Sequence, residues 1–335
     1  MAEAETAMTE AARPSPWRAR LITAARYLTI AVVAYFIVAT TVDQWPAVRG
    51  TFASLSWGVM IASTFFAVLS IGAVMMGWRS ILADLGHPLS VRAAAQINLV
   101  GSLGKYVPGS VWAYVLQMQL ARRFGVPRSR GFLASLVLTA IGISSGVLVG
   151  SLGLRAMATM TGPDARTGRY VMWISLALVP VVIAYTNPWV LSRLVGLALT
   201  LTRREPLERP FSARGLAITF GWGTLGYVFS GLHLWVLAGT VAGTGLRGLV
   251  IASAAMALAI IAGTVAFILP SGLGVREVVI GATLSGVGVP PGQALGLALV
   301  SRLLMTVADV GGAAIATVVA LRRFGPPAAQ SQTDE

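Results

Sequence analysis

Long apolar stretches alternate with short polar and basic connections along most of this 335-residue chain. A helix needs about 20 predominantly apolar residues to cross the hydrocarbon core of a bilayer. The pattern therefore predicts an all-α, polytopic membrane protein with about eight membrane segments. The predicted segments are 21–42, 52–78, 131–153, 170–186, 215–239, 248–269, 275–288 and 293–321.

The stretch 93–121 differs from these segments because it is only moderately apolar. Polar or helix-breaking residues interrupt it, namely Gln96, Asn98, Lys105, Pro108 and Gly109. Basic residues flank it on both sides, so a single crossing would place one basic cluster outside the cell. A re-entrant helical hairpin keeps both flanks on the cytoplasmic side. Irregular backbone at membrane depth needs protein or water around it, so the hairpin also predicts a polar cavity.

Two further breaks shape the predicted layout. The run Gly288-Val289-Pro290-Pro291-Gly292 divides the last apolar region into a short and a long helix. The segment 188–202, which begins at Pro188-Trp189, is expected to form an interfacial helix. The expected domains are a cytoplasmic tail over 1–20, a membrane domain over 21–322 and a cytoplasmic tail over 323–335.

Composition supports the membrane assignment and excludes a sizeable soluble domain. Hydrophobic residues make up 56% of the chain and charged residues only 11%, whereas soluble proteins carry roughly 25% charged residues. The mean hydropathy is +0.77. A soluble chain of this length would lack the polar surface needed to cover its core.

The net charge is +13, and the distribution of the basic residues along the chain gives the expected orientation. A strongly basic chain can bind nucleic acid, but in a membrane protein the basic residues collect in cytoplasmic loops. With the hairpin re-entrant, both termini are cytoplasmic and the expected location is the bacterial plasma membrane. The basic residues then expected outside are Arg49, Arg155, Arg166, Arg169 and Arg247. No nucleic-acid partner is expected.

Several classes of chemistry are not supported by the sequence. There is no cysteine and there are only two histidines, so no metal site or cofactor is expected. Nothing resembles a phosphate-hydrolysing P-loop, a Ser-His-Asp set or a zinc-binding HExxH motif. His233 is expected to be a polar helix-packing residue rather than a proton carrier.

The candidate chemistry lies in the charged residues at predicted membrane depth. These residues are Lys105, Arg276, Glu277, Arg302 and Asp309. A charge at the bilayer centre costs about 2.5–3.5 kcal/mol on insertion scales, so these residues should face a cavity or the protein interior. Arg302 is expected to meet Glu277, and Asp309 to meet Lys105 or Arg276. The alternative is that they act only as static contacts between helices.

The first motif runs from Gly101 to Trp112. Pro108 removes a backbone donor and Gly109 permits a tight turn, so a new helix can begin here with free N–H groups that attract anions. Lys105 adds a positive charge, and Tyr106 and Trp112 add amphipathic rings. The alternative is a kinked helix whose lysine reaches the interface.

The second motif is Leu269-Pro270-Ser271-Gly272-Leu273-Gly274-Val275-Arg276-Glu277. Gly272 and Gly274 allow backbone to approach a ligand closely, and an adjacent pair of opposite charges follows. Two broken helices in separate halves of a chain are typical of transporters, in which the helix starts point at anionic substrate groups. The alternative is a plain loop between spans, with Arg276 at the cytoplasmic boundary.

At these two motifs the chain resembles the flippase-like transmembrane family that includes the membrane region of lysylphosphatidylglycerol synthases of the MprF type. The resemblance covers about 21–321, and Ser301-Arg302-Leu303-Leu304 is similar to the family's arginine in its last long helix. The resemblance implies a membrane domain that binds or translocates a phosphate-containing lipid, either a phospholipid or a polyprenyl-phosphate-linked one. The large soluble domain that transfers lysine is not found in the sequence, so synthase activity is not expected.

The leading hypothesis is that the chain binds such a lipid by its headgroup, and it gives the site residues the following roles. Lys105, Arg276 and Arg302 would contact the lipid phosphate, while Glu277 and Asp309 would balance charge or bind a basic headgroup. Tyr106 and Trp112 would line the access route of the headgroup, and the backbone breaks would be supplied by Pro108, Gly109, Gly272 and Gly274. The second hypothesis is an intramembrane enzyme or accessory subunit in lipid-linked sugar or cell-envelope glycan synthesis, with a glycosyltransferase as partner.

Overall fold

The structure is a computed structural model, and the residues that it describes lie within Trp45–Glu335. The described residues are 45–107, 111–158, 180, 187–201, 210–239, 245–266 and 269–324. The predicted segment 21–42, almost all of 170–186, and both predicted tails apart from 323–324 lie outside them. The described residues are mostly helical and contain no strand, as the hydrophobic pattern predicts.

Ten α-helices and two 3-10 turns make up this part of the chain. They are α3 (Trp45–Ser54), α4 (Trp57–Asp84), α5 (Val91–Ser102), η1 (Leu103–Tyr106), α6 (Val111–Arg122), α7 (Arg128–Ala158), α9 (Pro188–Leu201), α10 (Ala213–Ala238), α11 (Gly245–Val265), η3 (Pro270–Gly272), α12 (Val275–Ser285) and α13 (Pro291–Phe324). The predicted helix over 52–78 begins later and ends later than expected. Ser56 caps a new helix by accepting a hydrogen bond from the Val59 N–H, and the helix then continues past Arg79 to Asp84.

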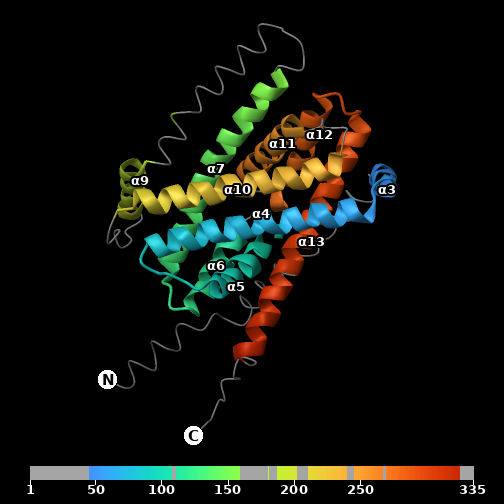
Figure 1. The fold of residues 1–335 in the computed structure, drawn as a ribbon. Coiled ribbons are helices and arrows are strands. Elements are labelled where there is room, and N and C mark those ends of the chain that lie inside the picture. Colours follow the sequence, from blue (N-terminus) through green and yellow to red (C-terminus); the bar gives the residue numbers. More distant parts are fainter. Residues whose placement is uncertain are drawn as a thin grey trace, which may run out of the picture. The chain divides into compact units, whose positions relative to one another are not determined.

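Helices α4 and α10 run side by side in opposite directions and form the centre of the bundle (Figure 1). Their junction is tied at one end by Asp84, whose carboxylate accepts hydrogen bonds from the backbone N–H and the hydroxyl of Ser212. Ser212 in turn caps α10 by accepting from the Gly215 N–H. The last turn of α4 therefore fixes where α10 begins.

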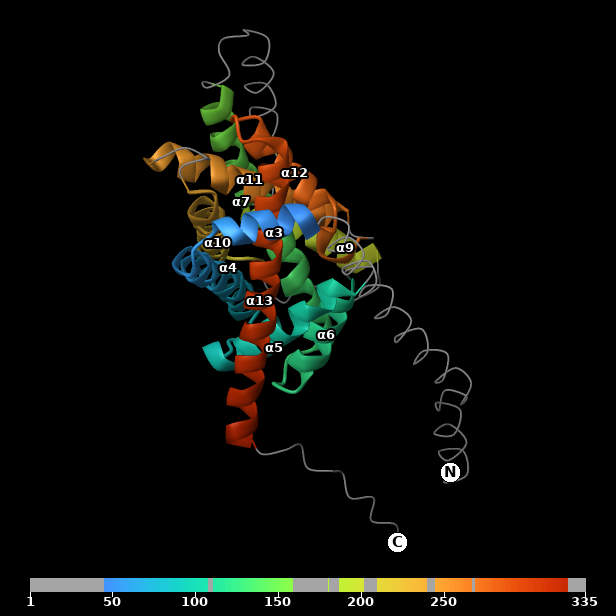
Figure 2. The same cartoon turned by 90° about the vertical axis from the view of Figure 1, so that its right-hand side faces the viewer.

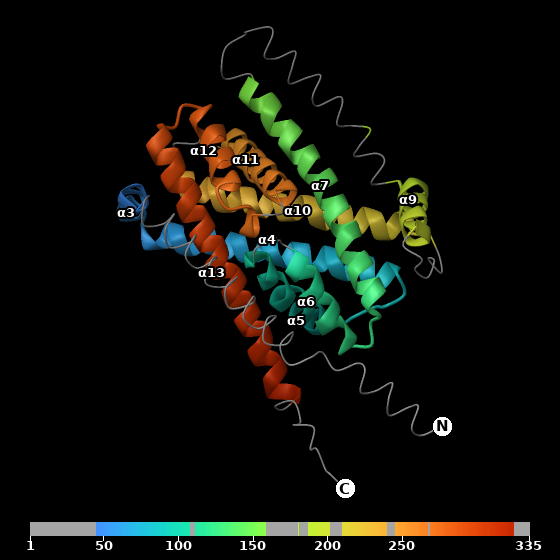
Figure 3. The same cartoon turned by 180° about the vertical axis from the view of Figure 1, so that it is seen from behind.

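The predicted hairpin over 93–121 is present as two short helices, α5 and α6, joined through η1. These helices pack against each other and beside α4, as seen from behind in Figure 3. Two glycines permit the close approach. A Cβ added at Gly101 would lie 2.5 Å from Cγ of Gln117, and one added at Gly104 would lie 2.5 Å from the backbone nitrogen of Ala113. Whether the hairpin is re-entrant in the bilayer remains a prediction.

Small residues also hold longer helices together. A Cβ on Gly153 of α7 would fall 2.0 Å from Cβ of Ala254 on α11, and one on Gly231 of α10 would fall 1.9 Å from Oγ of Ser253 on α11. Such contacts are the usual means by which membrane helices pack, because lipid supplies no hydrophobic force between them. They position α11 against both α7 and α10.

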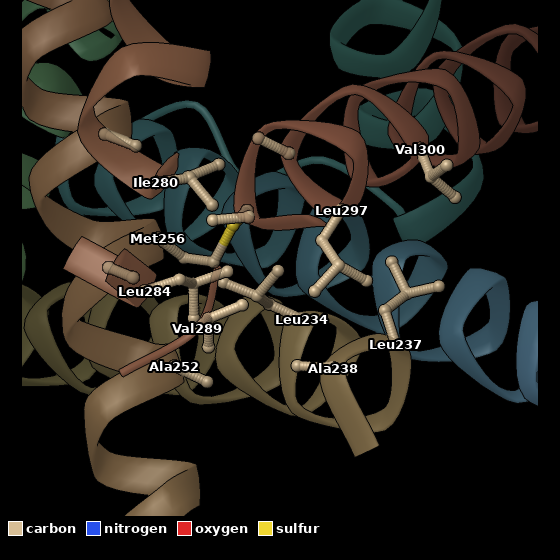
Figure 4. Packing of buried hydrophobic residues seen from close by; sticks show 14 of the residues in the cluster. Leu234, Leu237, Ala238, Ala252, Met256, Ile280, Leu284, Val289, Leu297 and Val300 are labelled. Atoms are coloured by element: carbon tan, nitrogen blue, oxygen red, sulfur yellow. The ribbon is translucent and has the colours of Figure 1, made fainter. Parts of the chain in front are cut away.

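Helices α11, α12 and α13 pack on the end of α10 through a core of aliphatic side chains (Figure 4). Leu234 and Leu237 of α10 meet Met256 of α11, Leu284 of α12 and Leu297 of α13 there. Helix α13 is the long connecting element, and it contacts α3, α4, α5 and α12 along its length (Figure 2). It therefore joins the hairpin to the α11–α12 unit.

Four of the described helices are long and apolar enough to cross a membrane, namely Trp57–Asp84, Arg128–Gly153, Gly245–Val265 and Pro291–Arg322. The predicted short segment 275–288 is the 11-residue helix α12, which is too short to cross a bilayer alone. The chain is thus an all-α polytopic membrane protein, and the number of eight crossings stays a prediction.

Candidate functional site

A cavity of about 550 Å³ lies between the helices, at the meeting point of the hairpin, α10, α11, α12 and α13. Its walls include the turn η1 at the tip of the hairpin and the turn η3 before α12. All five charged residues that the sequence places at membrane depth line it. The charges therefore face a cavity, as expected from the cost of exposing a charge to the bilayer centre.

The first pair of opposite charges is formed by Lys105 and Asp309. Lys105 lies in η1, and its Nζ atom is 2.6 Å from Oδ2 of Asp309 on α13. The hydroxyl of Tyr106 donates to the same oxygen at 2.6 Å. The side chain of Asp309 is 4% exposed and that of Lys105 is 32% exposed. The second oxygen of Asp309, Oδ1, is buried and has no hydrogen-bond partner among the described residues.

The second pair is formed by Arg302 and Glu277, as the sequence predicts. Nη1 of Arg302 on α13 contacts Oε1 of Glu277 on α12. Nη2 of Arg302 donates to the backbone oxygen of Pro270 in η3 at 3.3 Å, so the same guanidinium also holds the helix break in place. The side chain of Glu277 is 7% exposed, and its Oε2 atom is buried without a partner in the described part of the chain.

Arg276 differs from the other two cations because it has no partner in the part of the chain that the structure describes. Among the described residues, none forms a hydrogen bond or an ion pair with its guanidinium, although it lies within electrostatic range of Arg302, Glu277, Tyr106 and Asp309. Its aliphatic stem is packed: a Cβ added at Gly263 would lie 2.8 Å from Cγ of Arg276. The aliphatic part of the Arg276 side chain is therefore held in place, whereas its guanidinium has no acceptor among the residues that the structure describes.

The backbone before α12 explains how Arg276 reaches this position. Ser271, Gly272 and Gly274 have φ values of 51°, 67° and 83°, a region that favours glycine because a Cβ is strained there. The turn brings Gly272 against Gly263 of α11, where a Cβ would lie 2.5 Å from the Gly263 Cα. Gly274 is the N-cap of α12 and supplies no side-chain acceptor to the first turn, so the N–H groups at this helix start stay open to an anion.

The remaining residues of the predicted site are distributed differently. Trp112 lies on α6 with 49% of its surface exposed and is not part of the cavity wall. Gly272 and Gly274 shape the backbone beside the cavity but do not line it. Pro108 and Gly109 lie outside the described residues, so the predicted break at the tip of the hairpin is not described.

A second, neutral part of the cavity wall was not predicted from the sequence. Helices α4, α5, α6 and α7 contribute amides and hydroxyls but no charged group, including those of Asn98, Gln117 and Ser135. Ser135 donates to Oε1 of Gln117 at 2.7 Å and accepts from Nε1 of Trp78 at 3.0 Å. Asn98 is 4% exposed and lines the cavity. The available signal was the polar residue Asn98 within the moderately apolar stretch of the hairpin.

His233 is a packing residue, as expected from the sequence. It is fully buried on α10, and Nδ1 and Nε2 lie 2.7 Å and 2.8 Å from the hydroxyls of Ser63 and Ser301. Ser63 also donates to the backbone oxygen of His233. Because the Ser63 hydroxyl donates its proton to that backbone oxygen, the imidazole Nδ1–H must donate to Ser63. The other ring nitrogen, Nε2, then accepts from the Ser301 hydroxyl. The histidine thus joins α4, α10 and α13.

The sequence profile of the family described as lysylphosphatidylglycerol synthase TM region matches residues 24–313 of the chain. This match spans most of the chain and includes both broken-helix motifs and all five charged residues of the cavity. A comparison with curated proteins found no match.

Proposed function

This chain belongs to the lysylphosphatidylglycerol synthase transmembrane family, and we propose that it binds a phosphate-containing lipid in its cavity and moves that lipid between the leaflets of the membrane. It is an integral membrane protein of a lipid-related family. The observation that carries the proposal is the guanidinium of Arg276, which has no partner within the described ranges and lines a cavity among helices long enough to cross a bilayer.

The chemistry of Arg276 favours a phosphate. An unpaired charge inside a membrane protein is costly and marks a functional site by default. A guanidinium presents a planar set of donors that matches phosphate oxygens in a bidentate arrangement. The first turn of α12 adds backbone N–H groups whose N-cap, Gly274, provides no side-chain acceptor. An anion at this point would be held by both.

The two ion pairs support the same assignment. Lys105 and Arg302 are each bound to one carboxylate on the cavity wall. Their pairing keeps the cavity wall from holding three unbalanced cations, which would be costly in a low-dielectric site. A phosphate can therefore bind at Arg276, the cation left over, without breaking either pair.

The arrangement of broken helices supports translocation. Helices α5 and α6 have 12 residues each and α12 has 11, so none crosses a bilayer alone. The turns η1 and η3 at their ends contact each other beside the cavity. Discontinuous helices that meet around a substrate site are the common architecture of transporters that alternate access between two sides.

A carrier is favoured over an enzyme by the surroundings of Ser301, a serine that lines the cavity and contacts the buried His233. His233 accepts from Ser301, but its other nitrogen is directed to Ser63 rather than to a carboxylate. A nucleophilic serine needs a base that is oriented and charge-stabilised by a third group. We therefore propose no covalent chemistry at Ser301.

The test is lipid translocation in proteoliposomes with acyl-labelled fluorescent phosphatidylglycerol. A membrane-impermeant reductant quenches only the label in the outer leaflet, so quenching beyond that fraction reports translocation. Wild-type protein is expected to translocate the lipid, Arg276→Gln to reduce the rate to that of empty liposomes, and Arg276→Lys to restore part of it. Arg49→Gln, at an exposed arginine outside the cavity, is the matched control. Equal rates for wild type and Arg276→Gln would overturn the proposal.

A further inference from the structure

All five charged residues on the cavity wall come from η1, α12 and α13, where the hydroxyls of Tyr106, Ser301 and Thr306 accompany them. Helices α4, α5, α6 and α7 contribute no charged group to the wall. Their hydrogen-bonding groups, among them those of Asn98, Tyr114, Gln117 and Thr139, line the cavity together with apolar side chains such as Leu138. The part of a headgroup beyond a phosphate at Arg276 would therefore meet only uncharged groups on these helices, including amides and hydroxyls.

The net charge of the wall constrains which headgroup can fit. Lys105, Arg276 and Arg302 oppose Glu277 and Asp309, which leaves one net positive charge. A phosphodiester carries one negative charge, so a lipid whose headgroup is otherwise neutral brings the site to zero. A headgroup with an additional ammonium leaves one positive charge uncompensated in the bundle interior, where an unpaired charge is costly.

Polar groups on the wall have hydrogen-bonding capacity of a kind that suits hydroxyls. The amide of Asn98 lines the cavity and can both donate and accept hydrogen bonds. Oε2 of Glu277 and Oδ1 of Asp309 are buried and have no partner among the described residues. Each of these carboxylates already has a cation on its other oxygen. A hydroxyl can donate to the free oxygens and both donate to and accept from an amide, at no cost in charge.

We infer that the site described under the proposed function selects a phosphodiester lipid whose headgroup is a neutral polyol. This inference rests on that function and names its substrate class. The cavity volume of about 550 Å³ falls within the range of roughly 300–1,000 Å³ that is usual for small-molecule sites. The shared chemistry is present in glycerol-headed phospholipids and in polyprenyl-phosphate-linked sugars, which the experiment separates.

Native mass spectrometry of the full-length protein with an equimolar lipid mixture tests the inference. The mixture contains phosphatidylglycerol, phosphatidylethanolamine and phosphatidic acid with the same acyl chains, and a second mixture replaces phosphatidylglycerol with a polyprenyl-phosphoryl hexose. We expect at least one polyol lipid to exceed phosphatidylethanolamine by about tenfold or more, because the ammonium leaves the site charged. The mixture in which this preference is larger identifies the source of the headgroup.

Variants at Asn98 locate the selectivity. Asn98→Ala should reduce the preference for the polyol lipid over phosphatidic acid. Asn98→Asp adds one negative charge to the neutral side, so it should shift the preference toward phosphatidylethanolamine, a gain that a misfolded protein cannot produce. Gln96→Ala is the matched control, because Gln96 lies on the same helix but does not line the cavity, and it should leave all preferences unchanged.

The outcomes separate the two proposals. Binding that Arg276→Gln abolishes, combined with equal occupancy by phosphatidylethanolamine and both polyol lipids, would overturn the headgroup inference and leave the phosphate site intact. An unchanged lipid ratio in Asn98→Asp would also overturn it. Lipid binding that is insensitive to Arg276→Gln for every lipid in both mixtures would overturn the phosphate site itself.

Discussion

Lys105 and Asp309 form an ion pair of 2.6 Å that joins the tip of the hairpin to the middle of α13, far apart in the chain. The pair is asymmetric, because the Asp309 side chain is almost completely buried and about a third of the Lys105 side chain is exposed. The hydroxyl of Tyr106 shares the same carboxylate oxygen. The contact fixes η1, and with it one side of the cavity, relative to α13.

The asymmetry predicts unequal effects of removing either partner. Lys105→Met leaves the buried carboxylate of Asp309 with only the Tyr106 hydroxyl, whereas Asp309→Asn leaves a lysine that can still reach solvent. Removing one partner of a fully buried pair costs about 3–5 kcal/mol, and the exposure of Lys105 should bring the loss below that range. Thermal unfolding in detergent should show a larger decrease in midpoint for Lys105→Met. A larger decrease for Asp309→Asn would contradict this account.

The pair of Arg302 and Glu277 predicts strong coupling. Arg302→Gln leaves the buried carboxylate of Glu277 without its cation, and Glu277→Gln leaves the guanidinium with the Pro270 backbone oxygen alone. The double variant removes both charges and should recover part of the loss. A double-mutant cycle on the free energy of unfolding should give a coupling of about 0.5–3 kcal/mol. Additive effects of the two changes would show that the pair contributes nothing.

The turn before α12 predicts a contrast between two neighbouring glycines. Gly272 and Gly274 both have positive φ values, so an alanine at either position carries a backbone strain of about 1–2 kcal/mol. Only Gly272→Ala also brings a Cβ to 2.5 Å from the Gly263 Cα, whereas nothing lies within 4 Å of a Cβ at Gly274. Gly272→Ala should lower the unfolding midpoint clearly more than Gly274→Ala. Equal decreases would mean that the close approach of η3 to α11 is not required.

The re-entrant hairpin predicts that its two outer ends face the same side of the membrane. The chain contains no cysteine, so single cysteines can be introduced without removing any. Arg92→Cys and Arg123→Cys, both at exposed positions, should react with an impermeant maleimide only from the cytoplasmic side. Arg49→Cys, predicted to face outward, is the control with the opposite accessibility. Labelling of Arg92→Cys and Arg123→Cys from opposite sides would show that the hairpin crosses the membrane once.

Much of the fold and of the charged part of the site is predictable from the sequence. The reason is that a charged residue inside a bilayer is costly unless it has a partner or faces a cavity. Lys105, Arg276, Glu277, Arg302 and Asp309 stand out in apolar surroundings, and the need to pair them predicts Arg302 with Glu277 and allows Lys105 with Asp309. Both contacts are present. The helix breaks before Arg276 and after Gly288 follow from proline and glycine.

The remaining features depend on tertiary contacts that cannot be predicted from a single sequence. That Arg276 has no partner among the described residues is visible only once α11, α12 and α13 are packed. Asn98 and Gln117 appear as isolated polar residues until the hairpin brings them to one wall. Trp112, which is predicted to line the access route, lies exposed on α6 outside the cavity wall, and this role stays a prediction.

Arg276 is proposed to bind the phosphate of a membrane lipid inside the cavity. An experimental structure of the full chain determined in the presence of phosphatidylglycerol tests this binding. Phosphate density is expected in the cavity, with an oxygen within about 3.2 Å of a guanidinium nitrogen of Arg276. Lipid density confined to the outer surface of the helices, with the Arg276 guanidinium bonded only to protein or water, would contradict it.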